Sequence, residues 1–333
     1  MKDRRLTLTL GASRLRLPQF APTVFLDKST WFWKLDLSAK IMLISYDVLA
    51  ARPALLREPV RKTLGFTGKV IIDSGGFGRQ SSANARQLHD AQQRLRADVG
   101  VVLDEIPLLS MSKQRQEQVL DANLRDSRTI ARLPRGRMQL EVVIHGTTRL
   151  QQQTAARELA ATGIRIFGVP MSRYSQYRQY AQGVDRFLTA RQALPRSAVI
   201  HALGCGSRTL MGLLTYFGAD LFDSSGYFRT ATYGKRLDPI TMCVLGKPAG
   251  KTECDLCQTK QRVVKTLSQY VRNNLLETLK EATRLRCACE HRVLDEYLRE
   301  RLKKTALRTL QARADEIDPQ RQVVFYRAPR REN

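Results

Sequence analysis

Short apolar runs alternate with longer polar segments between residues 41 and 223, and this alternation restricts the possible folds more than any other feature. The apolar runs have the length of buried strands, and the segments between them have the length and residue spacing of helices. Strands that alternate with helices form crossover units on a parallel sheet. The expected strands span residues 41–45, 69–73, 99–104, 140–145, 163–169, 198–203 and 219–223.

Seven or eight such units in about 200 residues predict an α/β fold, specifically a (β/α)8 barrel. A doubly wound open sheet is the alternative, but no G-x-G-x-x-G motif follows the first strand. We expect four parts along the chain: an N-terminal cap (1–40), the catalytic barrel (41–245), a zinc-binding and basic helical region (246–315) and a tail (316–333).

Three of the expected strands end in an aspartate: Asp73, Asp104 and Asp223. A single aspartate at such a position is more often a helix N-cap than a catalyst. In a barrel, however, the carboxyl ends of all strands meet at one face, where active sites lie. The sequence therefore predicts one site built from three carboxylates, with His145 and the loop at Gly204 on the same face.

The charge of the chain indicates its partners. There are 56 Lys and Arg against 31 Asp and Glu, which gives a net charge of +25. Such a charge favours a polyanion, and we expect nucleic acid, with a ribosomal or anionic membrane surface as the alternatives. No apolar run approaches the ~20 residues of a membrane span, and no cleavable leader follows the N-terminus, so we expect a cytoplasmic protein.

The stretch Asp73-Ser74-Gly75-Gly76-Phe77 resembles the D-S-G-G-[FY] motif of the tRNA-guanine transglycosylases. Residues 103–105, 203–207 and 218–223 are similar to that family's F-D-E, M-G-V-G-T and G-x-D-x-F-D motifs, in the same order. The resemblance covers roughly residues 40–260. It implies a zinc-containing (β/α)8 enzyme that exchanges guanine in nucleic acid for a 7-deazaguanine.

The resemblance also implies roles for individual residues. Asp223 would be the nucleophile that attacks C1′ and forms a covalent sugar intermediate, and Asp73 would be the general acid/base. Asp104 would bind the Watson–Crick edge of the base. The implied substrate-binding residues are Ser74, Gly75, Gly76, Phe77, Asp104, His145, Gly168 and Gly204.

Two departures from the family pattern concern the substrate. His145 stands where the tRNA enzymes have Gln, and residues 224–234 differ from their P-T-R-x-[AG]-R-x-G run, which should meet the polynucleotide. Together with the basic charge, this is similar to the bacterial and phage branch that inserts 7-cyano-7-deazaguanine into DNA. We expect Arg229 to contact a phosphate and Tyr227 or Phe228 to stack or wedge beside a flipped base.

DNA is therefore the expected substrate and 7-cyano-7-deazaguanine the expected free base. A tRNA substrate is the alternative, and a catalytically silent barrel that binds nucleic acid is the second alternative. The chain has no P-loop, so an ATP-dependent partner protein could be needed to open duplex DNA.

Cys254 and Cys257 form a C-x2-C pair of the kind that binds structural Zn²⁺. The family uses C-x-C-x2-C and a later His, but Thr252 replaces the first Cys here, and Asn273-Asn274 lacks the His. Cys287 and His291 would lie one helical turn apart and are expected to complete the site. The alternative ligands are Cys289 and Cys243. Residues 275–313 are expected to form basic amphipathic helices that follow the nucleic-acid backbone.

Overall fold

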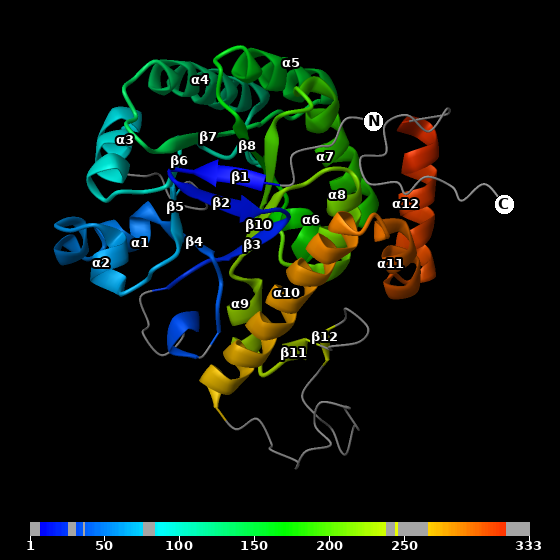
Figure 1. The fold of residues 1–333 in the computed structure, drawn as a ribbon. Helices are drawn as coiled ribbons and strands as arrows, with labels where there is room; N and C mark the ends of the chain where they lie inside the picture. Colours follow the sequence, from blue (N-terminus) through cyan, green and yellow to red (C-terminus); the bar gives the residue numbers. More distant parts are fainter. Residues whose placement is uncertain are drawn as a thin grey trace.

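A computed structural model describes residues 7–25, 31–35, 37–75, 84–237, 244–245 and 266–317. Within these ranges, eight parallel strands form one sheet in the order β3-β10-β9-β8-β7-β6-β5-β4 (Figure 1). The strands are β3 (Gln19–Pro22), β4 (Ile41–Ser45), β5 (Lys69–Asp73), β6 (Val99–Val101), β7 (Gln139–Val143), β8 (Ile166–Pro170), β9 (Val199–Leu203) and β10 (Leu221–Ser224). All seven strands expected from the sequence are present.

The sheet nearly closes into a barrel between its two outer strands, β3 and β4. Thr23, just after β3, forms a parallel bridge with Leu43 of β4, and the Val24 N–H donates to the Leu43 carbonyl at 2.8 Å. The predicted α/β class and the eight-stranded parallel arrangement are therefore confirmed, with a narrow seam where one bridge replaces a full ladder.

The range expected to be an N-terminal cap also supplies a barrel strand. Strand β3 pairs in parallel with β10, so that Ala21 lies opposite Asp223. Its four residues end in Pro22, and so short a run with a proline does not stand out as a central strand. The rest of the range holds the expected hairpin, β1 (Thr7–Leu10) and β2 (Ser13–Arg16), which pair antiparallel.

The hairpin covers one end of the barrel. Leucines at alternate positions, Leu8, Leu10, Leu15 and Leu17, pack into the same buried cluster as the inward-facing residues near the strand starts, such as Ile41. The outward-facing strand residues pack against the surrounding helices in a second cluster. The amino-terminal end of the barrel is thus closed by apolar side chains, and the carboxyl-terminal end is left for the site.

Helices follow most strands and surround the barrel (Figure 1). They are α1 (Tyr46–Ala50), α2 (Val60–Leu64), α3 (Ala85–Arg94), α4 (Lys113–Ala131), α5 (Arg149–Ala160), α6 (Ser172–Gln176), α7 (Tyr180–Ala193), α8 (Arg208–Tyr216) and α9 (Gly226–Thr232). Two short 3-10 turns, η2 (Phe32–Lys34) and η3 (Pro53–Leu56), complete this part. The caps are encoded locally: Asn84 and Thr148 accept from backbone N–H groups three residues on, in capping boxes.

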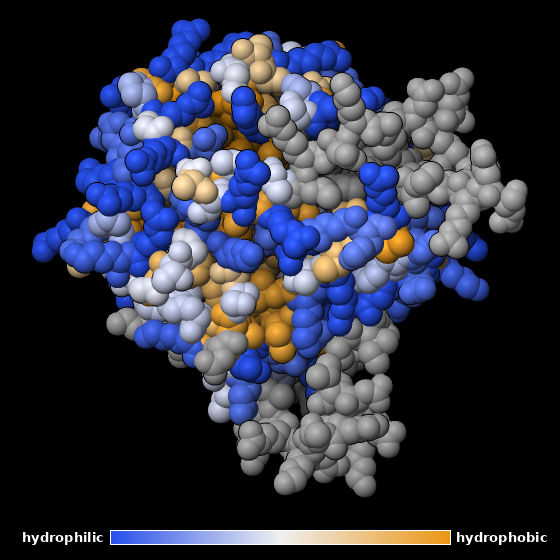
Figure 2. Space-filling view, in the orientation of Figure 1, coloured by the Kyte–Doolittle hydropathy of each residue, from blue (hydrophilic) through white to orange (hydrophobic). Residues whose placement is uncertain are grey.

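The basic C-terminal stretch forms three helices, α10 (Leu267–Glu290), α11 (Leu294–Arg301) and α12 (Lys304–Ile317). The apolar face expected of these amphipathic helices points inward, and Leu275, Leu285 and Leu298 are fully buried. Figure 2 shows hydrophilic residues over most of one face of the molecule, as the composition predicts. No helix in the described ranges is long and apolar enough to cross a membrane.

Asn274 joins α10 to the rest of the structure. This residue is fully buried, and its side chain accepts from the Leu237 N–H at 2.8 Å and donates to the carbonyls of Tyr227 and Lys235. It thus links α10 to α9 and to the small hairpin of β11 (Arg236–Leu237) and β12 (Val244–Leu245).

Candidate active site

Three carboxylates lie at the carboxyl-terminal end of the barrel, as expected. Asp73 ends β5, Asp104 follows β6, and Asp223 lies in β10. Burial raises the pKa of Asp73 from 3.8 to about 7, and the negative charges of Asp104 and Asp223 add to the rise. A carboxyl group with a pKa near neutrality can both donate and accept a proton, which is what a general acid/base requires.

Asp104 is held by two neighbours that the sequence placed in the same site. The Ser74 hydroxyl donates to one of its oxygens at 2.6 Å, and Nε2 of the buried His145 lies 2.7 Å from the other. Each carboxylate oxygen can accept a second hydrogen bond, so Asp104 keeps acceptor capacity for a base edge. His145 therefore orients an acidic residue in this structure.

Asp223 is buried and held from three sides. The Gly204 N–H donates to Oδ1 at 2.7 Å, the Thr23 hydroxyl donates to Oδ2 at 3.3 Å, and His201 Nε2 lies 3.2 Å from Oδ1. The His201 contact lies within ion-pair distance for a protonated ring and is not a hydrogen bond. Gly204 has a positive φ of 70°, a conformation that glycine adopts readily and that directs its N–H to the carboxylate.

Glu141 and His201 extend the site into the barrel interior, and neither was among the residues predicted from the sequence. Both side chains are fully buried, and His201 Nδ1 lies 3.0 Å and 3.1 Å from the two oxygens of Glu141. The sequence did contain a signal for both residues. Each occupies an inward position in a mostly apolar strand, where an ionisable residue is rarely found without a partner.

The predicted base-contacting glycines have structural reasons to lack a side chain. Gly75 has a φ of 85°, and a Cβ there would come within 2.5 Å of the Asp47 carboxyl carbon. A Cβ on Gly168 would lie 2.5 Å from Leu203 Cδ1 and 2.8 Å from Glu141 Oε1. Gly168 therefore makes room for Glu141. The predicted residues Gly76 and Phe77 lie outside the described residues.

The segment after Asp223 forms helix α9. Arg229 is exposed on it, as a phosphate contact requires. Tyr227 is buried, and its hydroxyl donates to the Thr23 carbonyl at 2.8 Å. Burial raises the pKa of this hydroxyl. The expectation that Tyr227 stacks beside a base is therefore not supported, because its ring closes the barrel near the β3–β4 seam.

The expected zinc ligands fall into two groups. Cys254 and Cys257, like the alternative Cys243, lie outside the described residues. Cys287 and His291 are exposed and one helical turn apart, with the His291 N–H bonded to the Cys287 carbonyl. No cluster of three or more His, Cys, Asp or Glu side chains suited to a metal occurs among the residues that are described.

The length of α10 sets a condition on the expected ligand set. Its rise of 1.5 Å per residue puts Cys287 about 30 Å from the helix start at Thr266. The short chain between Cys257 and Thr266 spans about 30 Å only when fully extended. A zinc site shared by Cys287, His291, Cys254 and Cys257 would therefore need the chain between Cys257 and Thr266 to run extended beside α10.

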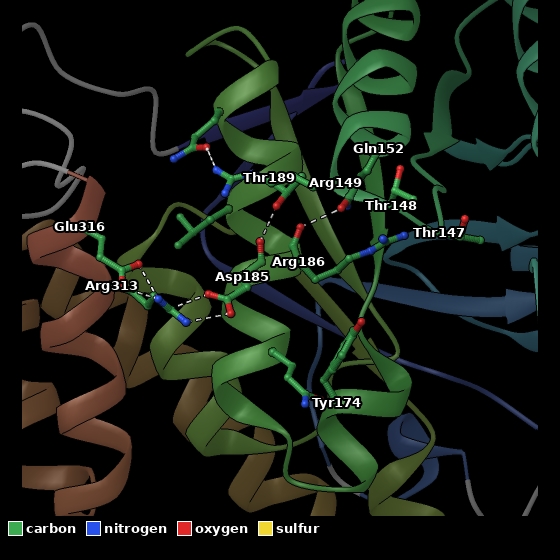
Figure 3. Close-up of a pocket in the computed structure, with 13 residues that line it drawn as sticks. Thr147, Thr148, Arg149, Gln152, Tyr174, Asp185, Arg186, Thr189, Arg313 and Glu316 are labelled. Atoms are coloured by element: carbon green, nitrogen blue, oxygen red, sulfur yellow. Dashed lines mark hydrogen bonds and ion pairs between the residues drawn. The ribbon is translucent and has the colours of Figure 1, made fainter. Parts of the chain in front are cut away.

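A pocket of about 460 Å³ lies outside the barrel, between the start of α5, helix α7 and helix α12 (Figure 3). Arg313 of α12 reaches across it and forms ion pairs with Asp185, at 2.6 Å, and with Glu316. None of the three carboxylates of the site lines this pocket. Asp185 and Glu316 neutralise the charge of Arg313, and the ion pair with Asp185 connects α12 to α7. The pocket is therefore not a candidate for the catalytic site.

Comparison with known proteins agrees with the geometry of the site. The family model described as queuine tRNA-ribosyltransferase matches residues 3–306. The tRNA-guanine(15) transglycosylase of Methanocaldococcus jannaschii is 25% identical over 245 residues, which cover 68% of this chain and 37% of the relative. That of Korarchaeum cryptofilum is 24% identical over 245 residues, 68% of this chain and 40% of the relative. The chain thus matches well under half the length of these relatives, but it belongs to the queuine tRNA-ribosyltransferase family of pentosyltransferases.

Proposed function

We propose that the protein exchanges guanine in a nucleic acid for a 7-deazaguanine through a covalent intermediate between Asp223 and the sugar. The observation that carries this proposal is the pairing of two carboxyl groups at one barrel end. Asp73 has a pKa of about 7, and Asp223 is held by a backbone N–H and a buried histidine. The family match supports the reaction class.

In the first step, the C1′–N9 bond of the target guanosine breaks as Oδ2 of Asp223 bonds to C1′, and protonated Asp73 donates its proton to the departing guanine. In the second step, ionised Asp73 accepts a proton from the incoming base. That base forms the new bond to C1′ and the ester to Asp223 breaks. Two displacements retain the configuration of the sugar.

The target nucleotide must leave its stack to reach this buried pair. Asp104, oriented by Ser74 and His145, would accept hydrogen bonds from the N–H donors of the flipped base. Arg229 would hold a neighbouring phosphate from the exposed side of α9.

The relatives favour tRNA as the nucleic acid, since those compared above are named as tRNA-guanine(15) transglycosylases. DNA with 7-cyano-7-deazaguanine is the second candidate, favoured by the departure of residues 224–234 from the pattern of the tRNA enzymes. In this structure the middle of that segment forms α9, Gly226–Thr232. The net charge of +25 suits either polymer.

The test offers the purified chain three substrates with radiolabelled guanine: tRNA, single-stranded DNA and duplex DNA. Guanine release that depends on added 7-cyano-7-deazaguanine, with the new base found by nucleoside mass spectrometry, supports the proposal and identifies the polymer. Asp223→Asn serves as the inactive control. Salt-sensitive binding of all three polymers without any exchange would instead support a catalytically silent nucleic-acid-binding barrel.

We further propose that Cys254 and Cys257 bind a structural Zn²⁺ ion without Cys287 and His291. Metal analysis by atomic emission separates the two ligand sets. If all four residues bound one ion, Cys254→Ser and Cys287→Ser would both lower the zinc content. The proposal predicts loss in Cys254→Ser and unchanged content in Cys287→Ser, since a shared site would need an extended chain between Cys257 and Thr266.

A further inference from the structure

A line of charged side chains runs through the barrel interior behind the nucleophile. Four neighbouring strands contribute to it: Glu141 from β7, the space left by Gly168 of β8, His201 from β9 and Asp223 from β10. Gly168 lies opposite His201 in the register of β8 and β9, so Glu141 reaches the imidazole across the missing side chain. The interior of such a barrel is normally filled by apolar side chains, and a buried charged line needs a specific reason.

The two ring nitrogens of His201 both face carboxylates. Nδ1 is 3.0 Å from Glu141 Oε1, and Nε2 is 3.2 Å from Asp223 Oδ1. Only the imidazolium carries a positive charge, which attracts both carboxylates and lets Nδ1 donate to Glu141. The other titratable groups close enough to act on this line are Asp73 of β5 and Cys205 after β9, which both sense the charge of Asp223.

We propose that Glu141 and His201 are positioning residues for Asp223: Glu141 holds His201 as an imidazolium, and this cation fixes one nucleophile oxygen and balances its charge during the reaction. The inference rests on the proposed function for its catalytic consequence. His201 and the Gly204 N–H both engage Oδ1, which leaves Oδ2, held only by the longer Thr23 contact, to attack the sugar.

Glu141 is needed because the charge of Asp223 changes during the reaction. When Asp223 becomes an ester with C1′, it is neutral, and His201 alone would then be an uncompensated cation in the barrel interior. Glu141 keeps the pair neutral in that state. Before attack, Glu141, His201 and Asp223 together carry one negative charge. That charge is lost when Asp223 forms the ester with the sugar.

The first arm of the test does not need activity. The chain has four histidines, so ring-labelled protein gives few signals, and the His201 signal is the one lost in His201→Gln. We expect His201 in the wild-type protein to keep both ring protons from pH 6 to pH 9. In Glu141→Gln its proton affinity should fall by at least about tenfold. A neutral His201 ring at pH 7, or an unchanged titration in Glu141→Gln, would overturn the inference.

The second arm measures the single-turnover rate of adduct formation on Asp223 between pH 6 and pH 9. We expect Glu141→Gln and His201→Gln to slow the step by about 10- to 100-fold, with little change in KM. In Glu141→Gln the rate should also fall at the pH where His201 loses its proton. His89→Gln is the matched control, since His89 is also buried and bonds only outside the site, to the Pro134 carbonyl and Gln93.

The two arms distinguish the possible failures. If the wild-type protein forms an adduct and both variants match its rate and pH profile, the inference is wrong and the proposed function stands. If the wild-type protein forms no adduct with any nucleic acid, the proposed function is wrong, and the ring titration still decides whether Glu141 holds His201 as a cation.

Discussion

Asp73→Asn should make the protein more stable above neutral pH while removing its activity. Asp73 is surrounded by Asp104 and Asp223 and is largely withdrawn from water, so its ionised form is unfavourable in the folded protein. Asn resembles the protonated carboxyl group in size and cannot ionise. The substitution therefore removes an electrostatic repulsion that destabilises the fold. It also removes the carboxyl group that the reaction requires.

The magnitude follows from the pKa of Asp73. The pKa rises from 3.8 in the unfolded chain to about 7 in the folded protein, and each unit corresponds to about 1.4 kcal/mol. Between these pH values the unfolded chain has released the proton and the folded protein retains it, so wild-type stability falls as pH rises through this window. The side chain keeps some solvent contact, so we expect a gain of about 2–4 kcal/mol for Asn above pH 7, and about none below pH 4.

Thermal unfolding by circular dichroism at a series of pH values tests this reasoning. For a chain of this length the expected gain corresponds to a rise in Tm of about 3–6 °C above pH 7, which shrinks toward zero at pH 4. The same variant should release no guanine. A Tm difference that does not depend on pH, or a variant that becomes less stable as pH rises, would refute the assigned pKa and with it the role of Asp73 as acid/base.

Three further predictions concern the supporting structure. Asn274→Ala removes the hydrogen bonds to the Leu237 N–H and the Tyr227 carbonyl, and we expect a loss of about 2–4 kcal/mol in unfolding free energy, measured by urea titration, with Asn273→Ala as the neighbouring control. Gly168→Ala should displace Glu141 and cost about 1–3 kcal/mol; a crystal structure with Glu141 in its original place would contradict this. Burial lowers the pKa of His201, but Glu141 and Asp223 have the larger combined effect and raise it from 6.5 to about 10. Protonation of His201 therefore stabilises the fold fully below about pH 6.5. The stability difference between wild type and His201→Gln should shrink as pH rises from 6.5 toward 10, and a constant difference would count against a charged ring.

The strand positions and the meeting of three carboxylates at one barrel end could be predicted because they follow from local patterns. Each apolar run that ends in Asp73, Asp104 or Asp223 marks both a buried strand and its carboxyl end, and a parallel barrel then brings those ends together. Strand β3 was harder to predict, since four residues that end in Pro22 become a strand only by pairing with β10.

Prediction of the charged residues in the barrel interior would have required knowledge of the strand register. Glu141 and His201 lie in different strands with β8 between them, and only the pairing of Gly168 with His201 shows that one side chain can reach the other. For Tyr227, the position in the sequence suggested the wrong environment for the side chain. Its place after the nucleophile suggested contact with nucleic acid, but the turn into α9 directs its ring inward to the Thr23 carbonyl.

Asp223 should form a covalent bond to a nucleic-acid sugar during the reaction. The most direct measurement is intact-protein mass spectrometry after incubation with tRNA or DNA oligonucleotides without an incoming base, followed by denaturation and peptide mapping. We expect a nucleotide adduct on the peptide that contains Asp223, lost in Asp223→Asn and released when 7-cyano-7-deazaguanine is added. Base exchange without any adduct, or an adduct on a different carboxylate, would contradict the account.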